Sequence, residues 1–225
     1  MDARLARLSI VVPALNEAAG IRAALEALAP LRARGHEVIV VDGGSSDRTP
    51  QLALGLCDQV IHGAKGRAVQ MNAGARAANG DALIFLHADT RLPADADRAV
   101  LAALAGSTWG RFDVRIEGRH PLLPLVAAAM NLRSRLTGIA TGDQAIFVRR
   151  DAFRGFPEIA LMEDIAFSAA MAARPACLRQ RAVTSGRRWE RGGVLRTVLL
   201  MWRLRFLYAI GVPPARLARD YAERR

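Results

Sequence analysis

Short apolar runs alternate with helical patterns in the first hundred residues, and this alternation constrains the fold more than any other feature of the chain. Residues 9–14, 36–41 and 82–87 are mainly apolar stretches of the kind that forms buried strands. Between them, apolar residues recur at helical spacing. Strands and helices in alternation predict an α/β fold, with a mostly parallel sheet covered by helices on both faces.

The same patterns predict the remaining elements. In the first half we expect helices over residues 16–30, from 49 onward and over 68–78, and a short strand over 59–62. In the second half we expect strands over 109–117 and 145–148, and helices over 121–135, 163–173 and 194–210. The last helix carries its apolar residues on one arc, with Arg196 and Arg203 beside it. That pattern is typical of a membrane or oligomer contact, and equally of a core helix.

Charge and cysteine content constrain the location and the partners. The net charge of +11 comes almost entirely from arginine, since Lys65 is the only lysine. A coding bias therefore explains it as well as a surface for phosphorylated ligands, anionic lipid or nucleic acid does. Cys57 and Cys177 lack the spacing of metal ligands, which favours a reducing, cytoplasmic compartment.

No targeting or membrane-spanning segment is expected. The first apolar run is short and contains Pro13, so we expect a core strand there and not a signal peptide. No stretch reaches the roughly 18 uncharged apolar residues of a transmembrane helix. We expect a cytoplasmic protein, and leave open a peripheral contact with the inner face of the plasma membrane.

Ligands of open parallel sheets bind outside the carboxyl ends of the strands, and Asp42 follows such a strand directly. Its carboxylate can accept hydrogen bonds from a base or a ribose there. Gly43 and Gly44 allow the backbone to turn tightly beside a ligand. The same turn suits helix capping by Ser46 or Asp47, and the two interpretations are compatible.

Asp89 closes another strand, two residues after His87. A carboxylate at that position can bind a divalent cation that bridges two phosphates, because Mg²⁺ commonly takes one or two carboxylates plus phosphate oxygens. His87 is a metal ligand, a phosphate donor or a locally hydrogen-bonded side chain, and its role stays open. Lys65 and Arg67 place two cations just before a helix, a reasonable clamp for a diphosphate or sugar.

Glu163 and Asp164 begin a helix in the second half of the chain. A carboxylate there can act as a general base toward a hydroxyl. Acidic residues also stabilise the N-terminus of a helix through its dipole, and spacing alone favours this second role.

Several common site types are missing from the sequence. The loop around Lys65 lacks the glycine-lysine-serine ending of a P-loop. No G-x-G-x-x-G follows the first strand, and no G-x-S-x-G is present, which argues against a dinucleotide-dependent oxidoreductase and an α/β-hydrolase.

Taken together, these segments resemble the family 2 glycosyltransferases, which have the GT-A fold, a Rossmann-like α/β sheet. Five stretches match in the family's order between about residues 8 and 170: 11–17, 40–47, 65–72, 85–90 and 163–164. The amino-acid sequence of residues 66–72, 87–90 and 142–144 resembles that of a small bacterial subgroup labelled as arsenosugar-biosynthesis glycosyltransferases. It is also similar to carotenoid-acid glycosyltransferases, which work at membranes.

The resemblance implies an inverting hexosyl-type transfer from a nucleoside-diphosphate sugar to a hydroxyl of a small molecule or lipid. It places these residues at the donor: Pro13, Asn16, Glu17, Asp42, Lys65, Arg67 and Asn72. Asp89 would hold Mg²⁺ or Mn²⁺, and Asp164 would be the catalytic base, which overrides the helix-dipole interpretation. We expect one domain over residues 1–225, with a donor-binding half at about 8–105, an acceptor and base half at about 106–190, and an amphipathic helix at about 194–210.

Two departures from the family pattern matter. His87 stands where the family often has the first Asp of its Asp-x-Asp motif, so the strictness of metal dependence is open. Arg187-Arg188-Trp189 only partly matches the Gln-x-x-Arg-Trp motif of processive members. A non-processive enzyme is therefore expected.

Two other functions were weighed. A nucleotidyltransferase acting on a sugar phosphate would need a glycine-rich basic loop after the first strand, and residues 13–17 do not form one. A nucleic-acid-binding protein would need a clustered basic face, whereas arginine is spread widely here and aromatic residues make up only 5%. We therefore expect no nucleic-acid partner, and the oligomeric state stays open.

Overall fold

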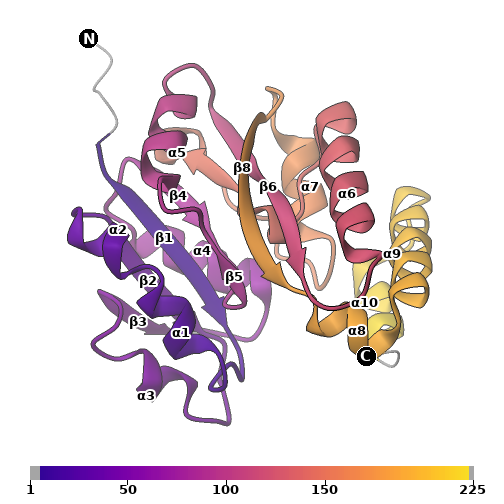
Figure 1. Ribbon diagram of the computed structural model, residues 1–225, viewed down its shortest axis with the longest axis horizontal. Coiled ribbons are helices and arrows are strands. Elements are labelled where there is room, and N and C mark those ends of the chain that lie inside the picture. Colours follow the sequence, from indigo (N-terminus) through magenta and orange to yellow (C-terminus); the bar gives the residue numbers. More distant parts are fainter. Residues whose placement is uncertain (1–5, 223–225) are drawn as a thin grey trace.

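The first four strands form the parallel sheet that the sequence predicts. The computed structural model describes residues 6–222. Its eight-stranded sheet has the order β3-β2-β1-β4-β7-β6-β8-β5 (Figure 1). β1 Leu8–Ala14, β2 Glu37–Asp42, β3 Gln59–His62 and β4 Ala82–Phe85 are parallel. Nearly all residues of β1, β2 and β4 are buried, as strands covered on both faces must be.

The strand register brings the carboxyl ends of these strands to one edge of the sheet. Ala14 lies opposite Asp42, and Asp42 lies opposite His62. β4 ends at Phe85, earlier than expected, so the segment 86–89 is the connection to β5 Thr90–Arg91. The side chains that follow these strand ends therefore share one edge, where ligands of such sheets bind.

The second half of the sheet is mixed. β7 Phe147–Arg149 is antiparallel to both β4 and β6 Trp109–Glu117, and β8 Ala176–Ser185 runs parallel to β6 and antiparallel to β5. The strand expected at 109–117 is confirmed with its bounds, whereas the one expected at 145–148 begins two residues later. β8 is not predicted by the sequence pattern, because charged residues interrupt its apolar run.

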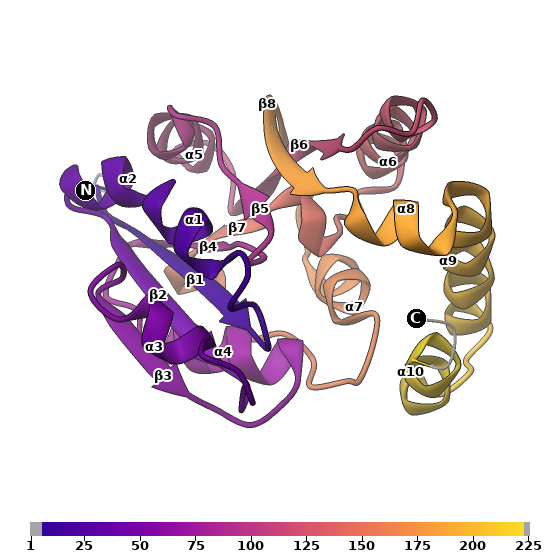
Figure 2. The same ribbon diagram turned by 60° about the horizontal axis from the view of Figure 1, so that its bottom comes forward.

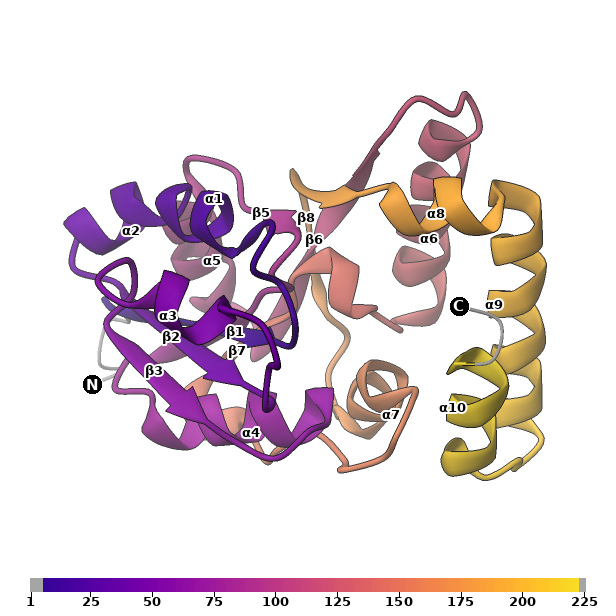
Figure 3. The ribbon, with the colours of Figure 1, turned by 90° about the horizontal axis from the view of Figure 1, so that it is seen from below.

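Helices cover both faces of the sheet (Figures 1 and 3). The helices are α1 Ile21–Glu26, α2 Ala29–Ala33, α3 Thr49–Ala53, α4 Arg67–Ala77, α5 Ala96–Leu104, α6 Leu123–Thr137, α7 Glu163–Ala170, α8 Arg187–Gly192, α9 Val194–Ala209 and α10 Pro214–Ala222. Short 3-10 turns lie at Gly142–Gln144 and Arg150–Ala152. α1, α2 and α5 share one core cluster with β1 and β2, while α4 and α7 belong to the cluster on the other face.

Side chains of β1 alternate between these two clusters. Ile10 and Val12 face α1 and α5, and Val11 faces α4. Gly74 allows α4 to lie directly on the sheet, because a Cβ there would be 2.3 Å from Cγ1 of Val11 and 3.0 Å from Cγ2 of Val41. The close contact holds the N-terminus of α4 at the edge where the strands end.

The first predicted helix is divided into two, which corrects its expected start and end. Asn16 adopts the left-handed region with φ of 56°, and the chain makes a turn before α1 begins at Ile21. Pro30 lies in the first turn of α2, where its missing N–H costs no helical hydrogen bond. At α7 the expected end near 173 is also wrong, since the helix stops at Ala170.

Cys57 and Cys177 are both free thiols, and the cytoplasmic location expected from them stays a prediction. Over residues 6–222, no helix is both long enough and apolar enough to span a bilayer.

Candidate active site

The loops after β1 and β2 are tied to each other by side chains. Asn16 Oδ1 accepts hydrogen bonds from Ser46, at 2.8 Å from its backbone N–H and 3.2 Å from its hydroxyl. Asp47 accepts from the N–H of Ala18 and from the N–H of Thr49, which opens α3. Asp47 thus braces the loop, but the predicted capping by Ser46 or Asp47 is not formed, because α3 has Arg48 at its N-cap and no side-chain cap. Asp42 remains available for other contacts.

Asp42 has one satisfied and one unsatisfied carboxylate oxygen. Its Oδ2 accepts hydrogen bonds from the N–H groups of Gly44 at 3.1 Å and Ser45 at 3.0 Å. Its Oδ1 is buried and has no hydrogen-bond partner among the residues described. A buried acceptor without a partner lowers the stability of the fold, so its presence needs an explanation, and a hydrogen bond from a ligand is one. The geometry suits an N–H or hydroxyl of a bound ligand.

Gln70 is a site residue whose role no local sequence pattern reveals. From α4 its Nε2 donates to the carbonyl oxygens of Ala14 and Val41, each at 2.8 Å, and so joins the ends of β1 and β2. A Cβ at Gly43 would come within 2.9 Å of the Gln70 amide, so only glycine leaves room for this brace. In the sequence, only the position of Gln70 within the family-like stretch 65–72 points to a role in the site.

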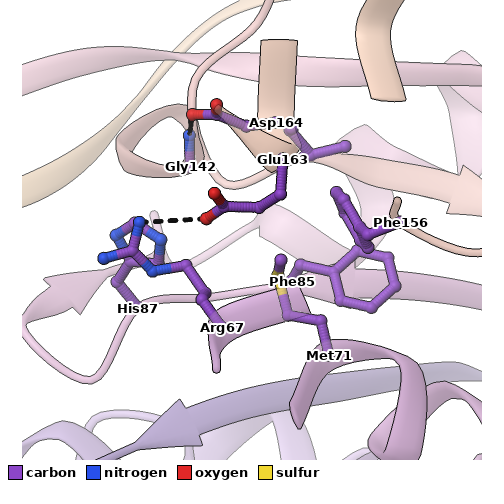
Figure 4. Close-up of a pocket in the computed structure, with 9 residues that line it drawn as sticks. Arg67, Met71, Phe85, His87, Gly142, Phe156, Glu163 and Asp164 are labelled. Atoms are coloured by element: carbon purple, nitrogen blue, oxygen red, sulfur yellow. Dashed lines mark hydrogen bonds and ion pairs between the residues drawn. The ribbon is translucent and has the colours of Figure 1, made fainter. Parts of the chain in front are cut away.

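Arg67 and Glu163 connect the two halves of the site across 96 positions of sequence. Arg67, the first residue of α4, donates from a terminal guanidinium nitrogen to Glu163 Oε1 at 3.1 Å (Figure 4). Burial opposes the charged form of Arg67, but the carboxylates of Glu163, Asp164 and Asp143 outweigh it and raise its pKa. The ion pair places α7, which carries Asp164, against the loop before α4.

Asp164 is a carboxylate poised to exchange a proton near neutral pH. Burial and then the neighbouring charge of Glu163 raise its pKa to about 6. Its Oδ2 accepts from the N–H of Gly142 at 2.9 Å (Figure 4). Its Oδ1 accepts from the N–H of Ile165 at 2.8 Å, and the two bonds orient the carboxylate. A pKa near the working pH is what a general base requires.

Asp164 lines a small pocket between the two halves. The lining residues are Arg67, Met71, Phe85, His87, Gly142, Ile146, Phe156, Glu163 and Asp164. Apolar side chains close one side of the pocket and charged groups lie on the other (Figure 4). The combination keeps Asp164 partly out of water, in agreement with its raised pKa.

His87 is held by Asp143, a partner that the sequence pattern does not identify. Its Nδ1 lies 3.3 Å from Asp143 Oδ1, while its Nε2 is buried without a hydrogen-bond partner in residues 6–222. Gly142 makes room for the ring, because a Cβ there would be 2.3 Å from His87 Nε2. Burial works against ionisation of Asp143, yet the hydrogen bond and charge of His87 lower its pKa overall.

The loop between β4 and β5 carries Asp89, the residue expected to bind a divalent cation together with phosphate oxygens. Asp89 is exposed in the loop after β4, and its carboxylate makes no hydrogen bond or ion pair with another described side chain. His87 Nε2 is buried against Gly142, and the role of His87 toward a metal stays open. No cluster of three or more His, Cys, Asp or Glu that could hold a metal exists within the described chain. The residues present therefore suit Mg²⁺ or Mn²⁺ with phosphate oxygens completing the shell, and not an all-protein metal cage.

Asn72 has a bracing position in the structure. Its Oδ1 accepts from the N–H of Phe156 at 2.8 Å, and its Nδ2 donates to the Phe156 carbonyl at 2.9 Å and to Glu158 at 3.3 Å. Its amide is therefore engaged with the loop that precedes α7. This arrangement does not support the predicted donor contact, and we assign Asn72 to loop support.

The remaining predicted donor residues lie at the same edge. Pro13 is half-buried near the end of β1, and Lys65 is exposed in the loop before α4. Glu17 binds Thr49 through its backbone N–H, at 2.7 Å, and its carboxylate lies 3.9 Å from Arg187. The structure thus brings the residues expected at the donor and at the base to one side of the sheet.

Ligands of open α/β sheets bind outside the carboxyl ends of the strands, which is where the acidic side chains of this chain lie. A comparison with family models identifies the family. The glycosyl transferase family 2 model matches residues 9–155. The chain therefore belongs to glycosyl transferase family 2.

Relatives of known role are glycosyltransferases as well. The PGL/p-HBAD biosynthesis glycosyltransferases of Mycobacterium tuberculosis and Mycobacterium bovis are 35% identical over 105 residues. The match covers 44% of this chain and 41% of the relative, so it spans about two fifths of the length of those proteins. The resemblance to the arsenosugar subgroup stays a prediction.

Solved structures share the GT-A fold at low sequence identity. Staphylococcus aureus TarS residues 1–349 with UDP-GlcNAc superimposes with a TM-score of 0.65 at 19% identity, over 80% of this chain and 59% of that one. The mannosyltransferase PcManGT of Pyrobaculum calidifontis with GDP-Man and Mn²⁺ gives 0.65 at 22%, over 99% and 70%. Glucosyl-3-phosphoglycerate synthase of M. tuberculosis with Mn²⁺, UDP and phosphoglyceric acid gives 0.62 at 21%, over 92% and 79%. The fold class is confirmed.

Proposed function

We propose that the chain transfers a hexosyl group, with inversion and without processivity, from a nucleoside-diphosphate sugar to a hydroxyl of a small molecule or lipid. The observation that carries the proposal is Asp164, a half-buried and oriented carboxylate with a pKa of about 6 in the pocket between the two halves of the site. It takes the proton from the acceptor hydroxyl as that oxygen attacks the anomeric carbon.

The donor side supplies binding and charge neutralisation. Asp42 receives a hydrogen bond from the base or ribose through its unpartnered Oδ1, as its burial supports. Lys65 and Arg67 lie near the diphosphate, where two cations offset the charge that develops on the leaving group. Pro13, Asn16 and Glu17 shape the edge on which the nucleoside rests.

Asp89 would hold the divalent cation. Mg²⁺ and Mn²⁺ occur with nucleotides in the structural neighbours, which supports their use here. When bound, such a cation supplies Lewis-acid stabilisation of the departing nucleoside diphosphate. The protein's part is to present the Asp89 carboxylate from the loop after β4.

The test is release of nucleoside diphosphate from UDP- and GDP-sugars, with and without Mn²⁺. Screening both donors by thermal shift first selects the one that stabilises the chain. We expect Asp164→Asn to lower kcat by about 10²–10⁴-fold while donor binding persists. We expect Asp89→Ala to weaken donor binding in Mn²⁺ and to remove the response to the metal.

Asp151→Asn serves as the matched control, because Asp151 is an exposed carboxylate that pairs with Arg149 and does not line the pocket around Asp164. It should retain wild-type turnover. Wild-type turnover in both Asp89→Ala and Asp164→Asn would refute the proposal. Release of pyrophosphate in place of nucleoside diphosphate would identify a nucleotidyltransferase instead.

A further inference from the structure

α9 presents an outer face of large apolar side chains that the rest of the described chain leaves uncovered. Five large residues on this face are 61–70% exposed: Leu195, Leu199, Trp202 and Phe206 of α9, and Ile210 directly after it. Their spacing of three and four positions places them along one side of the helix. Monomeric proteins rarely expose a continuous apolar stripe of this kind, which marks an interaction surface. The core-helix interpretation of this arc is therefore wrong.

The borders of this stripe are cationic. Arg196 and Arg203, seven residues apart, lie along one border and are exposed, and Arg205 lies on the other. α9 contains no acidic residue. Residues 194–222 contain five arginines and one acidic residue, Asp220, which lies 3.5 Å from Arg203. Apolar side chains bordered by arginine are complementary to a lipid layer with anionic headgroups.

We propose that the outer face of α9 binds an anionic membrane, with the helix lying in the plane of the headgroups. Its 16 residues make it about 24 Å long, and it is not apolar enough to cross a bilayer. The apolar stripe enters the boundary between headgroups and acyl chains, and the arginines reach phosphate. A second copy is a poorer partner, because it would bring two arginine-bordered stripes of the same charge together.

The opposite face of α9 packs toward the candidate base. Leu204 is fully buried in a cluster with Met162 and Leu217, and Met162 directly precedes Glu163 and Asp164. Figures 2 and 3 place α9 at the edge of the molecule, with α10 on its inner side. Membrane binding would thus hold the segment that carries Asp164 beside the lipid surface.

Trp202 provides a natural probe of this contact. Of the three tryptophans, Trp109 and Trp189 are buried, and Trp202 is 70% exposed. Adding vesicles of phosphatidylglycerol and phosphatidylcholine to the full chain should shift its emission to the blue, and high salt should weaken the shift by screening the arginines. Trp202→Phe should retain binding in a sedimentation assay and lose the shift. A wild-type emission that does not change with anionic vesicles would overturn the proposal.

Co-sedimentation with matched triple variants tests the assignment to α9. Changing Leu195, Leu199 and Phe206 to Gln should weaken vesicle binding by about tenfold or more, because three large side chains no longer leave water. The control changes the exposed Leu125, Leu132 and Leu136 of α6, at 58–67% exposure, to Gln, and should retain binding.

Equal loss in both variants would overturn the assignment to α9. Analytical ultracentrifugation tests whether a second copy covers α9 instead. If the wild type does not bind vesicles and forms a dimer that is lost only in the α9 variant, a second copy is the partner and the membrane proposal is refuted. Equal sedimentation with pure phosphatidylcholine would refute the role of the arginines.

Discussion

Replacing Asp164 by asparagine should remove activity and, at neutral pH, stabilise the folded chain. Asp164 has an ordinary pKa of 3.8, which burial and the charge of Glu163 raise to about 6 in the folded state. The folded state therefore prefers the protonated carboxyl. The stability that this preference contributes is fully present below pH 3.8 and is lost as the pH rises through about 6.

The size of the effect follows from that difference. A change of about two in pKa corresponds to about 3 kcal/mol at neutral pH, at about 1.4 kcal/mol for each unit. Asparagine keeps only one acceptor oxygen for the N–H groups of Gly142 and Ile165, which removes about 1–2 kcal/mol of that gain. We therefore expect Asp164→Asn to be about 1–2 kcal/mol more stable than the wild type at neutral pH.

Urea denaturation of both proteins at several pH values measures this difference. The advantage of the variant should shrink between about pH 7 and pH 4, because the wild-type carboxyl becomes protonated over that range. Asp151→Asn is the control, since hydrogen bonding to Arg149 lowers the pKa of the exposed Asp151. That variant should gain no stability at neutral pH. A less stable Asp164→Asn, or a difference independent of pH, would contradict the argument.

Three further predictions concern the same site and its support. Glu163→Gln should move the acid limb of the kcat/KM profile to lower pH, because the charge of Glu163 raises the pKa of Asp164; an unchanged limb would show that Asp164 is not the titrating base. Asn72→Ala should cost about 1–3 kcal/mol in urea unfolding by removing buried hydrogen bonds to the loop before α7, and wild-type stability would contradict its bracing role. Gly74→Ala should cost about 1–3 kcal/mol, since its Cβ would meet Val11 at 2.3 Å; a neutral result would mean that α4 can move away from the sheet.

Much of the donor side could be predicted because its signals are local. A buried strand between two helices needs a continuous apolar run, so the runs over 9–14, 36–41 and 82–87 predict strands from sequence alone, although the third strand ends earlier, at Phe85. Parallel strands then bring their carboxyl ends to one edge, which places Asp42 and Asp89 on the same edge of the sheet. The family resemblance identified Asp164 as the expected base. Its position at a helix N-terminus alone fits a helix-dipole role equally.

Contacts between distant segments could not be predicted in this way. The Arg67–Glu163 ion pair, the His87–Asp143 pair and the Gln70 brace each depend on how α4, α7 and the 142–144 turn pack. Asn72 shows the same limit, because its sequence context suggests a ligand contact and its side chain instead holds a loop 84 positions away. No local pattern encodes which of several nearby polar groups a side chain will meet.

α9 shows most clearly what the sequence determines and what only the tertiary structure decides. Its sequence determines that residues 194–210 form a helix with an apolar arc, since spacing of three and four positions requires only local geometry. Whether that arc faces a core or water depends on which side the sheet and α10 cover. The tertiary structure buries Leu204 and leaves Trp202 exposed, because the opposite face packs on Met162 and Leu217. The strands and their acidic ends are thus properties of the sequence, whereas the environment that raises the pKa of Asp164 and the direction of α9 were decided only by packing.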